Sequence, residues 1–362
     1  MNILIRVDAS RAIGTGHLMR CLTLADEMKV RGAEVTFISR QIPAYLRQSV
    51  EDNGHRVIKM DAESESRPHD GLEELEHSHF LETSQKQDSL QTKSHLNHEH
   101  FDWLIVDHYA LDYRWELEMR SITGKILVID DLADRMHDCD LVLDQNLQIS
   151  TRQRYSKRVP ESSKLLMGPR YAMLRTEFLD CNLELRVRKD KPKRIVVFFG
   201  GIDEANFTEP VILAVAALKI SDLEVDVIIG AKHPAREEIV KHCKDNSFTC
   251  HIQTKRIAFL FSRADASIGA GGSTIWERGY LGLPTLVFIA AENQREASIC
   301  AEHQNLLKLA ESSKDNAKAL QEEIGGFLSN RSMLESISRS CLSKLDAEGT
   351  CRVAKFMLSI VE

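Results

Sequence analysis

The sequence predicts an α/β protein built from two successive parallel-sheet domains. Short apolar runs rich in β-branched residues alternate with helix-like segments, which is typical of a parallel sheet wrapped by helices. The alternation stops in a polar stretch at residues 186–194, which predicts an interdomain linker, and then restarts. We therefore expect an N-terminal domain over residues 1–185 and a C-terminal domain over residues 194–362, two Rossmann-like domains facing a cleft.

The expected strands are short and almost entirely hydrophobic, as strands buried on both faces should be. The helix that follows the first strand has apolar residues at helical spacing, with Leu18, Cys21 and Leu22 on one side. The expected strands cover residues 3–7, 35–39, 104–107, 126–129, 141–143, 195–199, 223–230, 266–270 and 284–289.

Composition narrows the class of protein. The 362 residues are 43% hydrophobic and 28% charged, which is typical of an ordinary globular chain. A net charge of −7 and a pI of about 6.1 argue against a nucleic-acid partner. No apolar run approaches the roughly 18 residues of a membrane span, and the chain opens on a core strand rather than a cleavable signal. The eight cysteines lack metal or disulfide spacing, so we expect reduced thiols in a cytoplasmic protein. No heptad or exposed apolar stripe stands out, so we expect a monomer, and we expect no membrane partner.

One stretch, about residues 61–100, departs from the alternation. Glu, Asp, Ser, Gln and His dominate it, and it holds six of the fourteen histidines. A metal site is conceivable there, but the apolar residues that would fix ligand geometry are missing. We therefore interpret the stretch as a solvated low-complexity insertion. Its histidines are His69, His77, His79, His95, His98 and His100.

A glycine loop joins the first strand to the first helix and ends in His17. Gly14 and Gly16 allow a tight turn, so His17 should lie at the helix N-terminus. The positive end of a helix disfavours a protonated imidazole, and a neutral imidazole accepts a proton near pH 7. His17 is therefore a candidate general base, although a histidine that only caps or packs would give the same pattern. Asp8, at the end of the first strand, is a candidate for orienting its ring.

Polar residues also follow the other strands of the first domain. Asp107, His108 and Tyr109 end one strand and should face the same cleft as His17, where they are candidate substrate contacts. Residues 130–131 and 144–146 end the next two strands, and their Asp, Gln and Asn side chains fit helix caps and turns as well as ligands.

The second domain has two glycine loops directly after strands. Gly271, Gly272 and Ser273 should lie at the start of a helix, where backbone N–H groups and a hydroxyl suit a diphosphate. Gly200 and Gly201 form the other loop. Neither is a Walker or G-x-G-x-x-G motif, so the anion need not belong to ATP or NAD, and a tight turn without a ligand is the alternative for both.

Three polar residues follow these loops. Glu277 lies about one helical turn after Ser273, and because phosphates would repel its carboxylate, it suits neutral hydroxyls such as those of ribose. Asn293 and Gln294 follow the strand at residues 284–289 and offer amides for uncharged sugar or N-acetyl groups. A polar helix cap would look the same.

Taken together, these motifs resemble the nucleotide-sugar hydrolases of pseudaminic acid biosynthesis, which act on UDP-2,4-diacetamido-2,4,6-trideoxy-β-L-altropyranose. The resemblance extends in order over nearly the whole chain. Its motifs are residues 6–10 (Arg-Val-Asp-Ala-Ser), 13–21 (Ile-Gly-Thr-Gly-His-Leu-Met-Arg-Cys), 106–109 (Val-Asp-His-Tyr), 130–135 (Asp-Asp-Leu-Ala-Asp-Arg), 168–175 (Gly-Pro-Arg-Tyr-Ala-Met-Leu-Arg), 198–201 (Phe-Phe-Gly-Gly), 269–277 (Gly-Ala-Gly-Gly-Ser-Thr-Ile-Trp-Glu) and 292–294 (Glu-Asn-Gln).

The resemblance implies a glycosyltransferase-B-like fold, with UDP held by the C-terminal domain, the sugar facing the N-terminal one, and neither metal nor cofactor. It places the catalytic base on His17 and substrate contacts on Glu277 and Asn293, with a further contact at Arg170 or Arg175. The implied reaction is attack of water on C1 with inversion and release of UDP, in a pathway that supplies sugar for flagellin or surface polysaccharide. The 61–100 stretch is longer than this family leads us to expect.

Three alternatives stay open from the sequence. The chain could be a glycosyltransferase that uses a UDP-sugar donor, or a UDP-sugar-binding protein without activity. It could also hydrolyse a different diacetamido-trideoxy hexose, since sequence does not fix stereochemistry at single carbons.

Overall fold

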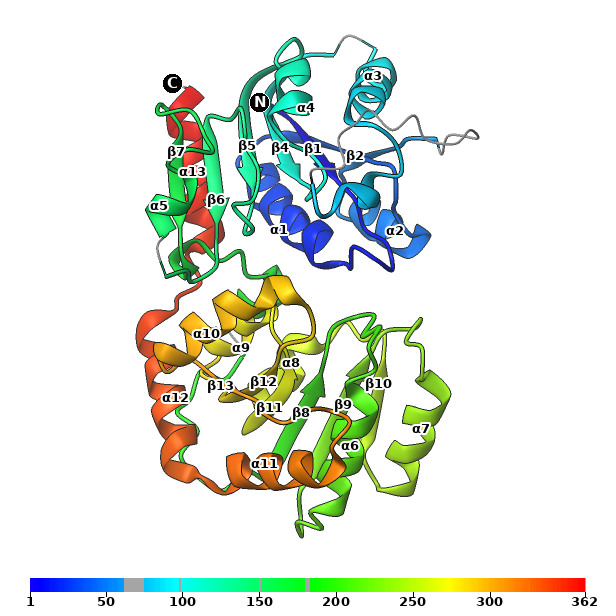
Figure 1. Ribbon diagram of the computed structural model, residues 1–362, viewed down its shortest axis with the longest axis vertical. Helices are drawn as coiled ribbons and strands as arrows, with labels where there is room; N and C mark the ends of the chain where they lie inside the picture. Colours follow the sequence, from blue (N-terminus) through cyan, green and yellow to red (C-terminus); the bar gives the residue numbers. More distant parts are fainter. Residues whose placement is uncertain (62–74, 98, 150, 180–182, 362) are drawn as a thin grey trace. The chain divides into compact units, whose positions relative to one another are not determined.

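The structure is a computed structural model that describes residues 1–61, 75–97, 99–149, 151–179 and 183–361 (Figure 1). It divides into two compact units, and the ranges that follow include the few residues left undescribed. Unit 1 comprises Met1–Asn146, Ser150–Met173 and Glu348–Glu362, and unit 2 comprises Leu147–Ile149 and Leu174–Ala347. Each unit has a parallel sheet, as the sequence predicts.

The observed division differs from the expected boundaries at two places. The polar stretch expected as a linker packs on unit 2, where Arg188 is buried and donates hydrogen bonds to Ser338 Oγ (3.0 Å) and the Ser262 carbonyl (2.8 Å). At the other end, helix α13 (Gly349–Val361) belongs to unit 1, because its apolar side chains are buried in the core beneath that sheet. Patterns local in sequence do not reveal such a return of the chain.

Unit 1 is a seven-stranded sheet in the order β3-β2-β1-β4-β5-β6-β7, and all its neighbouring strands are parallel. β1 and β4 lie at its centre, where the strand order reverses and ligands of open α/β sheets usually bind. The strands are β1 (Asn2–Val7), β2 (Glu34–Ser39), β3 (Arg56–Lys59), β4 (Phe101–Asp107), β5 (Thr123–Ile129), β6 (Leu141–Asp144) and β7 (Lys164–Met167).

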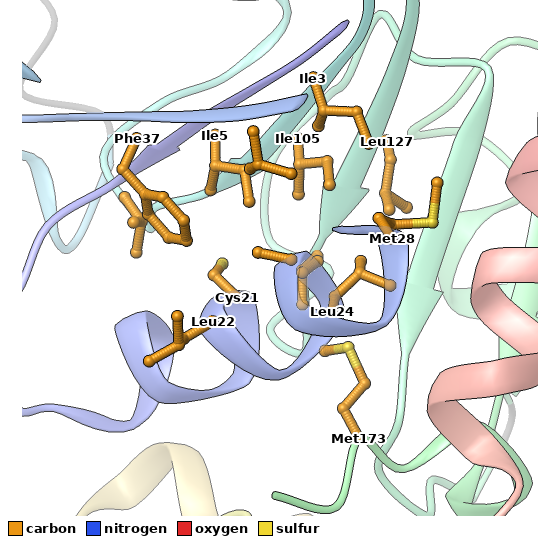
Figure 2. Close-up of a cluster of buried hydrophobic side chains, with 14 of the residues drawn as sticks. Ile3, Ile5, Cys21, Leu22, Leu24, Met28, Phe37, Ile105, Leu127 and Met173 are labelled. Atoms are coloured by element: carbon orange, nitrogen blue, oxygen red, sulfur yellow. The ribbon is translucent and has the colours of Figure 1, made fainter. Parts of the chain in front are cut away.

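Alternate side chains of the unit 1 strands enter two separate hydrophobic layers. Ile3 and Ile5 of β1 pack with Leu24 and Met28 of helix α1 (Gly16–Val30) (Figure 2). Leu4 enters the layer on the opposite face of the sheet. That second layer includes Trp115 and Met119 of helix α4 (Tyr113–Met119). The other helical segments of unit 1 are α2 (Ala44–Asp52), η1 (Ser78–Leu81), α3 (Gln85–His95), α5 (Thr151–Tyr155) and η2 (Pro169–Tyr171).

Unit 2 is a six-stranded parallel sheet in the order β10-β9-β8-β11-β12-β13. Its strands are β8 (Arg194–Phe198), β9 (Glu224–Ile229), β10 (Thr249–Ile252), β11 (Ala266–Ala270), β12 (Thr285–Phe288) and β13 (Lys308–Leu309). Its helical segments are η3 (Thr176–Leu179), α6 (Thr208–Ala217), α7 (Arg236–Asp245), α8 (Ile257–Arg263), α9 (Thr274–Tyr280), η4 (Glu292–Gln294), α10 (Arg295–His303), α11 (Ala317–Ser329) and α12 (Arg331–Lys344). In the described part of the chain, no helix has the length and apolar content to cross a membrane.

The stretch at residues 61–100 is not a solvated insertion where the structure describes it. Asp88 of α3 is fully buried and bonds Arg6 of β1 (2.9 Å), the guanidinium of Arg40 (3.0 Å) and the indole of Trp115 (2.9 Å). Some of the polar residues therefore belong to a buried ionic network, while others, such as Glu76 and Lys86, are exposed. His69 and His98 lie outside the described residues, and among those described, no group of three or more His, Cys, Asp or Glu side chains could hold a metal ion.

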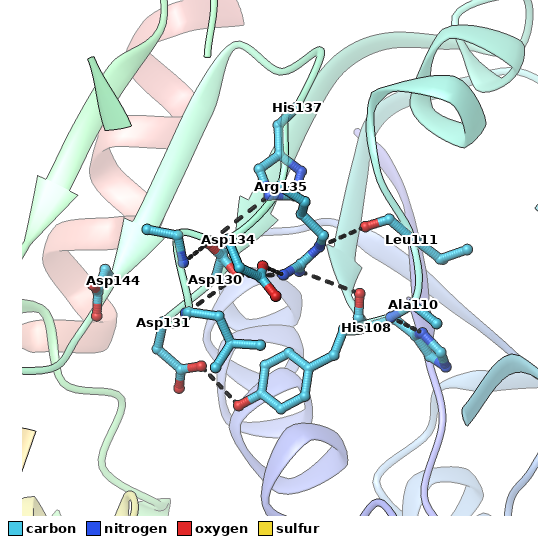
Figure 3. A network of polar contacts seen from close by, with 12 residues as sticks. His108, Ala110, Leu111, Asp130, Asp131, Asp134, Arg135, His137 and Asp144 are labelled. Carbon is cyan, nitrogen blue, oxygen red and sulfur yellow. Dashed lines mark hydrogen bonds and ion pairs between the residues drawn. The ribbon is translucent and has the colours of Figure 1, made fainter. Parts of the chain in front are cut away.

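A buried polar network holds the loop that follows β5 (Figure 3). Asp130 accepts hydrogen bonds from the backbone N–H of Leu132 (3.4 Å) and Ala133 (2.9 Å), and it pairs with Arg135 at 2.9 Å. Arg135 in turn donates to the Leu111 carbonyl at 2.8 Å. Of the two roles that the sequence allowed for Asp130, the structure shows the structural one.

Asp144, the last residue of β6, is fully buried close to other carboxylates. Burial, together with the charges of Asp131 and Asp130, raises the pKa of Asp144 to about 7. Its Oδ1 accepts the Asn146 backbone N–H at 3.0 Å, and Tyr155 Oη lies 3.4 Å from Oδ2. Asp144 therefore changes charge near neutral pH in the folded chain.

Replacing a buried leucine of α1 should destabilise the chain far more than replacing an exposed one of α4. Leu24 is fully buried against the sheet, whereas 53% of Leu117 is exposed. We expect Leu24→Ala to lower the free energy of unfolding by about 2–5 kcal/mol through lost burial and a cavity. Leu117→Ala should change it by less than about 0.5 kcal/mol. Urea denaturation of both variants checks this, and equal effects would contradict the assigned core.

Asp144→Asn should stabilise the chain more at pH 8 than at pH 5. The folded-state pKa of about 7 lies above the ordinary 3.8, so the wild-type chain loses stability as pH rises between these values. The amide that replaces the carboxyl group has the same shape and does not ionise. We therefore expect the difference in unfolding free energy between Asp144→Asn and the wild-type chain to grow by about 2–3 kcal/mol between pH 5 and pH 8, in favour of the variant. Urea denaturation at both pH values measures it, with the exposed Asp190→Asn as control. An advantage independent of pH would show that Asp144 is not the titrating group.

Candidate functional site

The candidate base His17 lies one residue inside α1, as the strand, loop and helix pattern predicts. Gly14 has a φ of +84°, a left-handed conformation that favours glycine, and its N–H donates to the Ser10 carbonyl at 2.8 Å. Thr15 caps the helix without a side-chain hydrogen bond, and Gly16 is its first residue. The turn therefore brings His17, 9% of which is exposed, to the carboxyl edge of the unit 1 sheet.

Asp107, the last residue of β4, joins the sheet to α1 through its buried carboxylate. Its Oδ1 lies 2.5 Å from His17 Nδ1, and Arg20 donates to Oδ2 from Nε (2.6 Å) and to Oδ1 from Nη2 (2.7 Å). Burial alone would raise the pKa of Asp107, but Arg20 and His17 hold it well below the usual carboxyl range. Asp107 is thus an ionised acceptor, held inside unit 1 with 1% of it exposed.

This carboxylate favours a proton on His17 Nδ1. Asp107 Oδ1 lies 2.5 Å from Nδ1, whereas Arg20 Nη2, which can only donate, is farther from Nδ1 at 3.2 Å. An ionised carboxylate only accepts hydrogen bonds, so the proton of a neutral His17 lies on Nδ1 and the lone pair on Nε2. Among the described residues, Nε2 has no hydrogen-bond partner. The arrangement is that of a general base oriented by a carboxylate. The spacing of His17 and Arg20, three residues apart on one helix face, is a signal that the sequence analysis did not use.

The expectation that Asp8 orients His17 is wrong. Asp8 is fully buried and binds Arg6 Nη1 (2.6 Å) and His108 Nε2 (3.2 Å) instead. Burial lowers the pKa of His108, whose Nδ1 accepts the Ala110 N–H at 3.1 Å, so a neutral His108 donates to Asp8. Arg6 of β1 and Asp8, which follows the strand, are two residues apart, so their side chains point to the same side of the chain. This favours pairing of Asp8 with Arg6 over pairing of Asp8 with His17.

Tyr109 packs its ring edge against His17 and is held by Asp131. The ring centroids of His17 and Tyr109 are 4.6 Å apart, and their planes are 87° apart. The Tyr109 hydroxyl donates to Asp131 Oδ1 at 2.7 Å (Figure 3), and Arg20 Nη1 donates to Asp131 Oδ2 at 3.2 Å. The structure thus brings Tyr109, Asp107 and His17 together. It adds Arg20, to which the sequence assigned no role, and Asp131, which the sequence left open as a cap, turn or ligand residue.

In unit 2, the loop at Gly200 and Gly201 follows β8. Gly200 has a φ of +101°, a conformation that favours glycine. Gly230, which follows β9, lies against this loop, and a Cβ at position 230 would lie 1.7 Å from the Gly201 carbonyl oxygen, so only glycine fits at position 230. Asp203 fixes the loop to α6, because it accepts the Thr208 N–H at 2.8 Å and hydroxyl at 2.6 Å. The loop is therefore tied to α6 at the carboxyl edge of the sheet.

The second loop runs from β11 into α9 and contains Gly271, Gly272 and Ser273. Gly272 has a φ of +82°, and Ser273 is the N-cap residue without a side-chain capping bond. The Gln294 side chain packs against the loop, since a Cβ on Gly271 would lie 3.1 Å from both its Cβ and its Oε1. Gln294 therefore joins this loop, whereas Asn293 is an exposed residue of η4.

A buried arginine, Arg278, supports that loop from inside unit 2. It is fully buried and donates to the Ala270 and Thr274 carbonyls, while its Nη1 has no hydrogen-bond partner among the described residues. Burial lowers its pKa to about 10, so it is a cation at neutral pH. The sequence analysis did not identify Arg278, because an arginine directly after Glu277 gives no sign in the sequence that it is buried.

Glu277 and Arg175 are bound to each other. Arg175 donates to Glu277 Oε1 from Nε (2.6 Å) and to Oε2 from Nη2 (2.8 Å), and it also pairs with Glu177 at 2.7 Å. Arg170 lies instead in unit 1, where it is exposed and stacks over Tyr171 at 5.2 Å. Of the two arginines that the resemblance left open, Arg175 therefore lies with the unit 2 candidate residues.

Comparison with curated proteins finds distant relatives, although no protein-family model matches the chain. The uncharacterized protein MJ1062 of Methanocaldococcus jannaschii is 26% identical over 324 residues, which cover 85% of this chain but 61% of that protein. The UDP-2,4-diacetamido-2,4,6-trideoxy-β-L-altropyranose hydrolase of Campylobacter jejuni is 25% identical over 76% of this chain and 87% of its own length. The spore coat polysaccharide biosynthesis protein SpsG of Bacillus subtilis is 22% identical over 100% of this chain and 99% of that protein.

Solved structures with the same fold cover nearly the whole chain. MurG of Acinetobacter baumannii has a TM-score of 0.63 at 14% identity, with 99% of each chain covered. The spinosyn rhamnosyltransferase SpnG, complexed with thymidine diphosphate, has a TM-score of 0.64 at 14% identity, with 98% of this chain and 99% of that one covered. The expected glycosyltransferase-B-like fold is confirmed, and the distant sequence relatives point to a nucleotide-sugar-related family.

Proposed function

We propose that the protein hydrolyses UDP-2,4-diacetamido-2,4,6-trideoxy-β-L-altropyranose to UDP and the free sugar, without a metal ion, in pseudaminic acid biosynthesis. The observation that carries the proposal is the buried carboxylate of Asp107, which engages His17 Nδ1 at 2.5 Å and so leaves Nε2 as the nitrogen that can accept a proton. The distant similarity to the Campylobacter jejuni hydrolase supports the choice of substrate.

In this proposal a water molecule attacks C1 of the sugar while His17 Nε2 takes its proton. The bond between C1 and the diphosphate oxygen breaks, and UDP leaves with the electron pair. Asp107 stabilises the imidazolium that forms, as the carboxylate of a base and carboxylate pair does. Attack opposite the leaving group inverts the configuration at C1.

Unit 2 supplies the groups for UDP in the same proposal. Backbone N–H groups of Gly271, Gly272 and Ser273 take the diphosphate, whose charge grows as C1 separates from it. Glu277 binds the ribose hydroxyls, and the two hydrogen bonds from Arg175 orient its carboxylate. Asn293 and Gln294 supply amide groups for uncharged parts of the substrate.

A glycosyltransferase that uses a UDP-sugar donor is the second candidate. It is favoured by one observation, the full-length fold similarity to the rhamnosyltransferase SpnG. In that case, His17 would take its proton from an acceptor hydroxyl rather than from water.

Hydrolysis in ¹⁸O-water by the EDTA-treated protein tests the proposal. We expect release of UDP, ¹⁸O in the sugar and an inverted C1, measured by mass spectrometry and NMR. Appearance of ¹⁸O in UDP would mean attack at phosphorus and would remove His17 from C1. Turnover only with an added acceptor would establish the transferase, and binding without any turnover would establish a binding protein. Activity lost with EDTA and restored by a divalent ion would overturn the metal-free mechanism.

Replacing the base or its orienting carboxylate should lower kcat. His17→Ala and His17→Asn remove the proton acceptor, so we expect about 10²- to 10⁴-fold slower turnover. Asp107→Asn places an amide beside Nδ1, which permits the tautomer with a protonated Nε2, and we expect a loss of about 10²-fold or more.

Steady-state kinetics with the UDP-sugar measures these effects, and His95→Ala is the matched control because that ring bonds the Gln91 carbonyl of its own helix. Thermal melts and UDP titration confirm that each variant is folded. Wild-type turnover by folded His17→Ala would exclude His17 as the base.

A further inference from the structure

A short segment of the 61–100 stretch is anchored to the edge of the unit 1 sheet where His17 lies. Leu81, the last residue of η1, is 1% exposed and packs in the hydrophobic core. The Gln41 side chain donates to the Phe80 carbonyl at 2.7 Å, and the Gln41 carbonyl accepts the Ala9 N–H at 2.7 Å. These contacts tie η1 to the loops that follow β1 and β2, so its position relative to His17 is fixed.

Four aromatic rings form a continuous row from the base to this segment. Tyr109 lies edge-on to His17, and the His77 ring lies 5.3 Å from the Tyr109 ring. Phe80 stacks on His77, with centroids 5.2 Å apart and planes within 13°. His77 and Phe80 thus extend the surface beside His17 with flat, weakly polar rings.

The outer rings of the row are only partly covered by protein. Tyr109 is 7% exposed, whereas His77 and Phe80 are half-buried. A partly exposed ring stack at the carboxyl edge of a parallel sheet lies where ligands of open α/β folds bind. A sugar ring has a face of C–H groups, and deoxygenation or N-acetylation adds methyl groups, so such a ligand gains by burying these surfaces against rings.

We propose that His77, with Phe80 and Tyr109, forms an aromatic wall that packs against the apolar surface of the sugar and selects deoxygenated, N-acylated sugars. This deepens the proposed function and rests on it. His77 is a binding residue in this role, and it acts through its flat ring rather than through a proton. A hydroxyl-rich sugar would have to give up water to lie on the wall, so it binds less well.

Three variants test the wall. His77→Ala removes the ring, His77→Phe keeps a flat ring without nitrogen atoms, and His95→Ala is a histidine replacement elsewhere in the same stretch. We expect His77→Ala to raise KM for the UDP-diacetamido-trideoxy sugar about 5- to 10-fold, which is the size of one lost ring contact, with kcat much less affected. The KM of His77→Phe should stay within about twofold of the wild-type KM, and the KM of His95→Ala should equal the wild-type KM.

Calorimetric titration with UDP and with the UDP-sugar separates the wall from the nucleotide contacts. We expect His77→Ala to weaken binding of the UDP-sugar by the same factor while its affinity for UDP is unchanged. An unchanged affinity for the UDP-sugar, or an equal loss for both ligands, would overturn the proposal. So would a loss in His77→Phe as large as in His77→Ala, since that would assign His77 a polar role.

The same titrations distinguish failure of the wall from failure of the hydrolase assignment. If the wild-type protein binds the UDP-sugar without hydrolysing it, the proposed reaction is wrong, but the effect of His77→Ala on sugar binding still decides the wall. If hydrolysis proceeds and His77→Ala matches wild type in KM and affinity, the wall is wrong and the reaction stands. UDP-N-acetylglucosamine, which keeps its C6 hydroxyl, should bind the wild-type protein less tightly than the trideoxy sugar; equal binding would overturn the selectivity.

Discussion

The buried carboxylate of Asp107 is the constraint on which the unit 1 site depends. A charge with 1% exposure must be paired inside the protein, and its charged partner Arg20, with His17 and the Cys21 thiol, comes from α1. The helix therefore has one rotational setting that satisfies the carboxylate and also turns Leu24 and Met28 toward the sheet. The ionic contact specifies the arrangement, and the hydrophobic layer provides most of the stability.

Much of the fold was predictable because parallel α/β units have a strong local signature. Apolar strands and helical spacing appear in sequence windows of fewer than twenty residues, and the glycine loop before His17 is equally local. The partner of His17 was not predictable in this way, since Asp8 and Asp107 end adjacent strands at the same edge of the sheet. Only the pairing of Asp8 with Arg6 distinguishes the two aspartates, and the spacing of two residues between Arg6 of β1 and Asp8 just after it can be seen in the sequence.

The stretch at residues 61–100 shows why composition misled the prediction. Solvated segments and buried ionic networks use the same residue types, and they differ in whether partners exist elsewhere in the chain. Asp88 meets Arg6, 82 residues away, and Trp115, 27 residues away, and no local window contains all three. The same reason hides the return of α13 to unit 1, which depends on an apolar face matching a helix more than 300 residues earlier.

Buried and partly buried arginines are held in two ways. Arg6 and Arg20 of unit 1 and Arg175 of unit 2 meet carboxylates directly, whereas the fully buried Arg278 of unit 2 is held by backbone carbonyls and the adjacent Glu277 is bound to Arg175. A buried cation without a direct counter-charge costs stability, and the lowered pKa of Arg278, about 10, reflects that cost. The residue before the candidate diphosphate loop is also constrained, since a Cβ on Gly269 would lie 2.1 Å from the Phe198 carbonyl oxygen and 2.6 Å from Arg278 Nη1. The glycine is therefore required first by the backbone of the neighbouring strand β8, and the buried arginine adds to that constraint.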